Sequence, residues 1–280
     1  MKVEANKVKG EAKSVTLDSG AIITYGERGV ENKEILITGA FYHHTFMPVV
    51  ENLAKRYHVY AVVMRFEGPG EELNKDGSIN WSKQWGKDIY DLSVKLGIKR
   101  FHYVGKCHGT VPGWWLFKNH PEVLIDFCSF FLGPHILPQN SNVWESNMAK
   151  GNMKELMAMS MRNVESGIQK KMEELKCIGP NAKSPITLEY GGFPEKIWEN
   201  DVEAIEHDLK NATVPIGYLF GSLDPLFKDY YDCNMKLPFI TKGCHFTILE
   251  GECHLMELDC PDRVADEAFA FIDQAHKKYE

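Results

Sequence analysis

Residues 104–110 read VGKCHGT, and this stretch decides how the rest of the chain is interpreted. Gly105 and Gly109 flank Cys107 between a short apolar run and an expected helix. A turn tight enough to project one side chain from a sheet leaves no room for neighbouring side chains, so glycine is expected on both sides. The amino end of the following helix favours a thiolate over a thiol. The stretch therefore predicts a nucleophilic Cys107 on a sharp turn, with the backbone N–H of His108 facing the same space.

Strand-like and helix-like segments alternate on both sides of this turn. Alternating β-branched residues around an Asp-Ser-Gly turn predict an opening hairpin at 13–17 and 21–25. The later apolar and helical patterns predict strands at 34–38, 58–64, 101–104, 216–220 and 246–249, and helices at about 46–56, 85–96 and 262–277. This alternation is typical of an α/β protein with a mostly parallel central sheet and helices on both faces.

The pattern changes between about residues 134 and 212. Methionines and charged residues lie there in helix-like segments that are broken by glycine and proline. We expect a helical cap at 134–212, inserted into a discontinuous core formed by 1–133 and 213–280. Methionine is most often core filler, but in a cap above Cys107 it suits an irregular apolar pocket, and Met157 is the methionine we expect to contact substrate.

Composition and charge exclude several classes of partner. The net charge is −7 and the basic residues are scattered, which argues against nucleic acid. The first residues lack the apolar centre of a secretory signal, and no apolar run approaches about 18 residues, so we expect a cytoplasmic protein without a membrane partner. We expect a small-molecule substrate, and the chain could form a homodimer.

The seven cysteines have neither an even number nor a short regular spacing. A disulfide framework is therefore not expected, and reduced thiols are the default. No closely spaced ligand pair of the C-x-x-C type occurs, which argues against structural zinc. The glycines of 68–70 do not form a nucleotide-binding motif. We expect no metal and no cofactor.

The cysteine turn and the segments around it resemble the α/β-hydrolase family, with cysteine in place of the serine of G-x-S-x-G. The segment DIYDLSVKLGIKRFHYVGKCHG, residues 88–109, is similar to the helix, strand and nucleophile turn of that family. LITGAF, residues 36–41, is similar to its oxyanion loop. The resemblance implies that backbone N–H groups of Ala40 or Phe41 complete an oxyanion hole with His108.

The same resemblance assigns the other two members of a catalytic triad. PIGYLFGSLDPLF, residues 215–227, is similar to the strand and turn that supply the acid, which implies Asp224. ILEGECHLMELDCPDRVADEAFAFI, residues 248–272, is similar to the terminal histidine segment, which implies His254. The order of nucleophile, acid and histidine is the order that this family uses. The simpler alternatives are a turn residue before proline for Asp224 and a structural histidine for His254.

Three further residues are candidates for substrate binding. His43 and His44 are expected in the loop after the oxyanion strand, where they could line the pocket or form an exposed polar surface. Arg65 ends a core strand and could bind a substrate carboxylate, but a structural ion pair is the simpler interpretation.

The predicted chemistry is acyl transfer through a thioester on Cys107, which His254 and Asp224 assist. A thiolate is both a strong nucleophile and a good leaving group, so an activated or strained carbonyl fits better than an ordinary amide. An enol-lactone, a thioester, a cyclic ketone or a β-diketone is such a carbonyl compound. By resemblance, hydrolysis of a lactone is the first choice among these reactions. Three alternatives stay open: hydrolysis of a carbon–carbon bond beside a ketone, acyl transfer to an amine or alcohol, and a binding protein without turnover.

Overall fold

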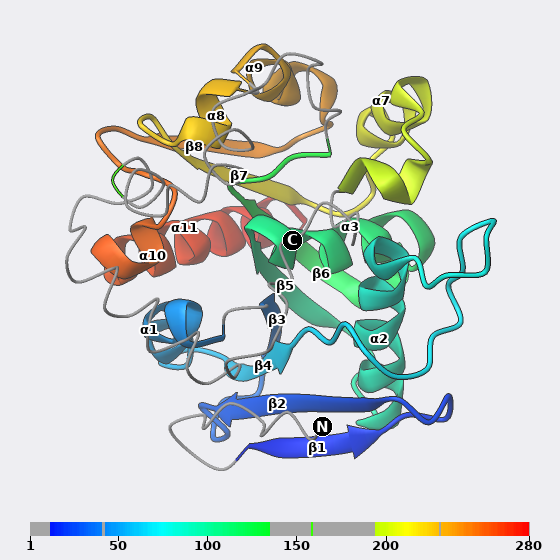
Figure 1. The fold of residues 1–280 in the computed structure, drawn as a ribbon. Helices are drawn as coiled ribbons and strands as arrows, with labels where there is room; N and C mark the ends of the chain where they lie inside the picture. Colours follow the sequence, from blue (N-terminus) through cyan, green and yellow to red (C-terminus); the bar gives the residue numbers. More distant parts are fainter. Residues whose placement is uncertain (1–11, 41–42, 135–157, 159–193, 230, 280) are drawn as a thin grey trace.

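A single eight-stranded sheet forms the centre of the molecule (Figure 1). The computed structural model describes residues 12–40, 43–134, 158, 194–229 and 231–279. The strand order is β1-β2-β4-β3-β5-β6-β7-β8, in which β2 pairs antiparallel with β1 and β4 and the strands from β4 to β8 are parallel. The strands are β1 (Lys13–Thr16), β2 (Ile22–Arg28), β3 (Ile35–Ala40), β4 (His58–Val63), β5 (Phe101–Lys106), β6 (Leu124–Phe130), β7 (Ile216–Gly221) and β8 (His245–Leu249).

Helices cover both faces of the sheet, because a parallel sheet has two apolar faces to bury. One face carries α1 (His43–Leu53) and α11 (Pro261–Tyr279), which pack against each other. The other carries α2 (Trp81–Lys95) and α3 (Thr110–Asn119), which form the closest helix pair of the described residues. Two hydrophobic clusters result, one on each face.

Seven further helices lie in the described part of the chain. They are η1 (Cys107–Gly109), η2 (Pro121–Val123), η4 (Pro194–Trp198), α7 (Val202–Lys210), α8 (Pro225–Asp229), α9 (Tyr231–Ile240) and α10 (Met256–Asp259). Within the described residues, no helix is both long and apolar enough to cross a membrane.

The structure confirms the predicted fold class, and it corrects several boundaries. The hairpin, the buried strands and the helices at the expected places are present. β3 continues to Ala40, two residues beyond the expected end, because it pairs with both β4 and β5. Helix α1 begins at His43 and so replaces the expected loop at that position. The sequence analysis did not predict β6.

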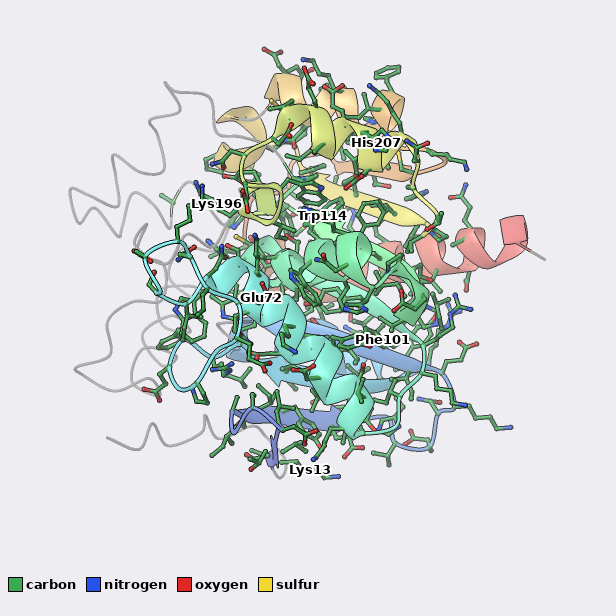
Figure 2. The ribbon with its side chains drawn as sticks, turned by 90° about the vertical axis from the view of Figure 1, so that its right-hand side faces the viewer. Lys13, Glu72, Phe101, Trp114, Lys196 and His207 are labelled. Carbon is green, nitrogen blue, oxygen red and sulfur yellow. The ribbon has the colours of Figure 1, made fainter. Side chains whose placement is uncertain are left out.

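Most of the predicted cap lies outside the described residues. Its last part, η4 and α7, is helical and packs on the core, with Ile197, Trp198, Ile205 and Leu209 in the same hydrophobic cluster as α2 and α3. The carboxyl-terminal part of the 134–212 segment therefore belongs to the packed body of the protein. Figure 2 shows this region, with Lys196 at one end and His207 on α7.

Candidate active site

The turn between β5 and α3 holds Cys107 in the left-handed region of backbone space, at φ 52°. A non-glycine residue there is strained, and such strain is concentrated at functional sites. Gly105 is required by packing, because a Cβ atom at that position would lie 2.3 Å from the carbonyl oxygen of Gly109 and 2.6 Å from Cα of Thr110. The buried Tyr103 hydroxyl donates to the same Gly109 oxygen at 2.8 Å. The close packing at Gly105 and the hydrogen bond from Tyr103 therefore fix the turn, and the thiol of Cys107 stays partly exposed.

Asp224 and His254 meet beyond the carboxyl ends of β7 and β8. The loops that carry them lie so close that a Cβ atom at Gly221 would be 2.4 Å from the carbonyl oxygen of Glu252. The backbone N–H of Leu223 donates to that same oxygen at 2.9 Å, which joins the two loops. Oδ2 of Asp224 is 2.9 Å from Nδ1 of His254, and both side chains are buried. This contact orients the imidazole and leaves Nε2 on the far side of the ring from the carboxylate.

Electrostatics favour a charged pair at this site. Burial works to raise the pKa of the Cys107 thiol, but the charges of His108 and His254 and hydrogen bonds from both rings outweigh it, so that the pKa lies well below its usual range. Burial of the His254 ring works against protonation, but the carboxylate of Asp224 outweighs it and raises the pKa of His254 to about 9. The arrangement therefore supports a thiolate beside an imidazolium.

A buried ion pair lies beside this pair of groups. Nζ of Lys106 is 2.7 Å from Oε1 of Glu257, whose side chain is fully buried. Glu257 lies on α10, on the turn that follows His254, so the contact ties the histidine loop to the cysteine turn. The amine also lies 5.7 Å from the ring centroid of Phe131, which in turn makes an edge contact with the His254 ring at 5.4 Å. Burial opposes the charge of Lys106, but Glu257 and the Cys107 thiolate raise its pKa.

Sequence analysis missed these three supporting residues. Glu257 lies three residues after His254, and this spacing indicates a carboxyl about one helical turn from the imidazole. Lys106 directly precedes Cys107 in the sequence, which was the signal for it. No signal identifies Phe131, whose φ of 71° follows from the way the chain leaves β6.

The predicted oxyanion donors are only partly described. His108 lies in η1, immediately after Cys107, and β3 packs against η1. Ala40 is the last residue of β3, so its backbone reaches this turn. Phe41 lies outside the described residues. The structure thus brings Ala40 and His108 to the same end of the sheet.

The predicted substrate-binding residues have different outcomes. His43 and His44 begin α1, so the loop that the sequence suggested is a helix start. Met157 lies outside the described residues.

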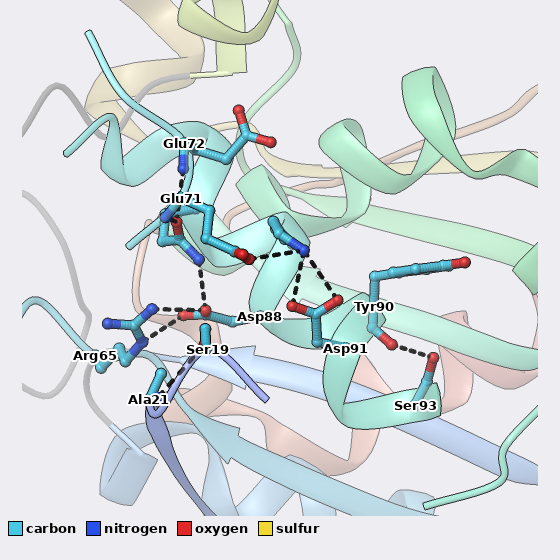
Figure 3. Close-up of polar contacts among 11 residues, drawn as sticks. Ser19, Ala21, Arg65, Glu71, Glu72, Asp88, Tyr90, Asp91 and Ser93 are labelled. Atoms are coloured by element: carbon cyan, nitrogen blue, oxygen red, sulfur yellow. Dashed lines mark hydrogen bonds and ion pairs between the residues drawn. The ribbon is translucent and has the colours of Figure 1, made fainter. Parts of the chain in front are cut away.

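Arg65 forms a structural ion pair, the simpler of the two interpretations that the sequence allowed. Its Nε and Nη2 atoms each lie 2.8 Å from a carboxylate oxygen of Asp88 on α2 (Figure 3). Nη1 donates to the carbonyl oxygen of Glu67, and the guanidinium lies 5.4 Å from the Trp81 ring centroid. Gln84 also donates to Asp88 at 2.8 Å. The guanidinium is therefore used to join the end of β4 to α2.

In the described part of the chain, no group of three or more His, Cys, Asp or Glu side chains could hold a metal ion. The six cysteines there form no disulfide with one another.

Comparison with known proteins identifies the fold. No family model and no curated protein matches the chain. Among solved structures, the naproxen esterase of Bacillus subtilis matches with a TM-score of 0.70 at 15% identity, covering 95% of this chain and 92% of that one. A serine hydrolase from Cycloclasticus zankles matches with a TM-score of 0.71 at 16% identity, covering 94% and 98%. The enol-lactonase of Burkholderia xenovorans LB400 matches with a TM-score of 0.64 at 14% identity, covering 93% and 100%.

These likenesses, together with the strand order, show that the chain has the α/β-hydrolase fold. Identities of 14–16% show the fold alone. The chemistry is argued from the side chains of this chain.

Proposed function

We propose that this protein is a hydrolase that uses Cys107 as a nucleophile on an activated or strained carbonyl, with Asp224 and His254 as its acid and base. One observation carries the proposal: a partly exposed thiol on a strained turn interacts with a buried imidazole whose Nδ1 is 2.9 Å from a buried carboxylate. This is the relation of nucleophile, base and orienting acid that acyl transfer requires.

The mechanism has two steps. The Cys107 thiolate attacks the carbonyl carbon, and the backbone N–H groups of His108 and of Ala40 or Phe41 stabilise the oxyanion, each donor contributing on the order of 3 kcal/mol. The bond to the leaving oxygen breaks, and protonated His254 donates a proton to that oxygen. Neutral His254 then takes a proton from water, hydroxide attacks the thioester, and the thiolate leaves as the acid is released.

The nature of the nucleophile supports a lactone or thioester as the substrate. Thiolate is a weaker base than alkoxide and leaves readily, so an amine would not be expelled in its place, whereas an enolate or thiolate would. The structural likeness to an enol-lactonase is compatible with this choice. We place enol-lactones first, then thioesters and cyclic ketones or β-diketones.

Intact-protein mass spectrometry after brief exposure to a panel of enol-lactones, aryl thioesters and β-diketones tests the proposal. We expect one acyl adduct per chain, mapped to Cys107 by peptide analysis and absent in Cys107→Ala. His254→Gln should accumulate the adduct, because deacylation lacks its base. Cys233→Ala is a matched control, since Cys233 is also partly exposed and should not affect labelling.

Two results would overturn the proposal. One is turnover of the same compound by Cys107→Ala at the wild-type rate. The other is acylation that is spread evenly over the cysteines. Release of an ester instead of an acid in the presence of an added alcohol would identify a transferase.

A further inference from the structure

His108, the residue after the nucleophile, brings a second imidazole to the thiol. Its Nδ1 atom is 3.3 Å from Sγ of Cys107, within hydrogen-bonding distance for sulfur. Side chains of consecutive residues usually diverge, but the positive φ of Cys107 and the tight η1 turn place these two side by side. Cys107 therefore has an imidazole on each side, one from its own turn and one from the loop after β8.

Glu195 comes to the same region from a distant part of the sequence. It lies in η4, which packs against α2 and α3, and its side chain is only 5% exposed. Its Oε2 atom has no hydrogen-bond partner within the described part of the chain. A buried carboxyl oxygen without a partner is costly, and such groups are retained mainly where they serve a function.

Two lysines on the helices that η4 packs against have partners other than Glu195. Lys118 on α3 donates to the carbonyl oxygen of Ile197 at 3.0 Å, and Lys83 on α2 pairs with Glu199 at 3.2 Å. Figure 2 shows Lys196 at the outer end of this segment, away from the labelled Trp114 of α3. The charges that act on the Glu195 carboxyl are those of Lys196 and His108.

Burial raises the pKa of Glu195 to about 7, against the opposing effects of Lys196 and His108. The same imidazole of His108 lowers the pKa of Cys107 by its charge and by its hydrogen bond. His108 thus contacts the Cys107 thiol and also interacts electrostatically with the buried Glu195 carboxyl. The other titratable groups around the thiol are His254 with Asp224, and Lys106 with Glu257.

We propose that His108 is a second catalytic imidazole, which donates a hydrogen bond from Nδ1 to the Cys107 thiolate, and that the buried Glu195 carboxyl is a positioning residue for this ring. The proposal deepens the proposed function and rests on Cys107 as the nucleophile. It assigns to His108 a side-chain role besides that of its backbone N–H. The thiolate then has two donors, so that loss of either ring weakens the ionised state without abolishing it.

The pH dependence of Cys107 alkylation tests the proposal without any substrate. Iodoacetamide reacts with the thiolate, so the rate at Cys107, followed by peptide mass spectrometry between pH 4 and 10, gives the midpoint of its ionisation. We expect His108→Gln and His254→Gln each to shift the midpoint upward by about one pH unit, which slows alkylation about tenfold at any pH below the wild-type midpoint. The double variant should approach an ordinary thiol. His120→Gln is the matched control, since His120 lies at the far end of α3 and pairs with Glu122.

Glu195→Gln separates the role of the carboxyl from a general loss of structure. The change keeps the size of the side chain but removes its negative charge, so the midpoint of Cys107 ionisation should move upward. A wild-type profile in His108→Gln would overturn the proposal. So would a Glu195→Gln profile with the wild-type midpoint. If His108→Gln fails to give the circular dichroism spectrum of the wild type, the Glu195→Gln profile alone decides.

Failure of this inference is distinguishable from failure of the proposed function. A depressed midpoint that depends on His108, without any acyl adduct from carbonyl compounds, would support the second imidazole and refute the hydrolase. An acyl adduct on Cys107 with an alkylation profile that does not depend on His108 would support the hydrolase and refute the second imidazole.

Discussion

Cys107 and His254 have opposite pKa shifts, and together these shifts define the charge state of the site. The thiol loses its proton at a lower pH than usual, and the imidazole keeps its proton up to about pH 9. Between those limits both groups are charged, and each stabilises the other. A coupled pair of this kind titrates as a unit, so the rate should follow the pair instead of either residue alone.

The alkaline limit of the reaction should be set by His254. Because the imidazolium donates the proton to the leaving group, kcat/KM for an acyl substrate should fall above about pH 9, where this proton is lost. Asp224→Asn removes the carboxylate that raises the pKa of His254, so the fall should move to lower pH. A pH–rate profile of both proteins measures the shift.

Alkylation provides the internal control for this prediction. The thiolate persists above pH 9, so the rate of iodoacetamide reaction at Cys107 should not fall there in either protein. An identical alkaline limit in wild type and Asp224→Asn would contradict the assignment of the base.

At the residue scale, the sequence predicted the turn at Cys107 from its glycines and the candidates Asp224 and His254 from their order along the chain. The glycines around Cys107 indicated the strained turn, and the structure has positive φ there. Asp224 and His254 were assigned by resemblance, and the structure places them 2.9 Å apart. Glu195 could not be predicted, because its burial depends on the packing of η4 against α2 and α3, which lie far away in the sequence.

At the scale of elements, close packing at the junction of β5, η1 and α3 determines where Cys107 lies. Thr110 begins α3 directly after η1, and the helix then runs back over β5 and β6. The chain can reverse this sharply only where Gly105 allows the backbone of Gly109 and Thr110 to approach. The reactive position of Cys107 is therefore a consequence of close backbone contact.

Gly105→Ala should open this junction. The added Cβ would meet backbone atoms at 2.3 and 2.6 Å, which cannot rotate away, so we expect a loss of about 3 kcal/mol in the free energy of unfolding. Fast alkylation of Cys107 should be lost with it. Urea unfolding and the alkylation rate at pH 7 measure the two effects.

Gly97→Ala is the matched glycine variant. Gly97 has φ +70° but open space around its Cβ position, so the change should cost only about 1 kcal/mol, from backbone strain. Alkylation of Cys107 should be unchanged. Equal loss of reactivity in both variants would show that the close contact at Gly105 is not what positions the thiol.

Most elements could be predicted from periodicity, and the misses have physical causes. β6 has the sequence LIDFCSF, in which Asp126 and Ser129 interrupt the apolar run. Both polar side chains have partners within the protein. Asp126 contacts His102 on β5 at 2.8 Å, and the hydroxyl of Ser129 donates to the carbonyl oxygen of Leu132. The start of α1 at His43 was missed because its first turn carries no apolar periodicity.

At the scale of the molecule, two hydrophobic clusters separated by the sheet hold the layers together. Trp114 on α3 is central to one of them. Its ring contacts the rings of Phe127 on β6, Tyr218 on β7 and Trp198 on η4, with centroid distances of 4.8–6.3 Å. One fully buried side chain therefore connects a helix, two strands and the segment that carries Glu195.

Trp114→Ala should lower global stability more than any single surface change. Loss of a buried tryptophan leaves a cavity that costs about 3–5 kcal/mol, or a fall in Tm of roughly 10 °C for a chain of this size. Differential scanning calorimetry measures it. Phe239→Ala is the matched control, because Phe239 is 87% exposed and its loss should change stability by less than about 0.5 kcal/mol. A similar fall in both variants would contradict the central place of Trp114.

The parallel order of the sheet has a consequence for how the protein is made. Cys107 directly follows the fifth strand, and His254 lies in the loop after the eighth, roughly 150 residues later in the chain. At about 5–20 residues per second, a ribosome adds these two residues roughly 7–30 seconds apart. Until the eighth strand joins the seventh, the sulfur has no partner from that loop. The nascent chain therefore carries the Cys107 sulfur without the His254 ring while the intervening residues are made.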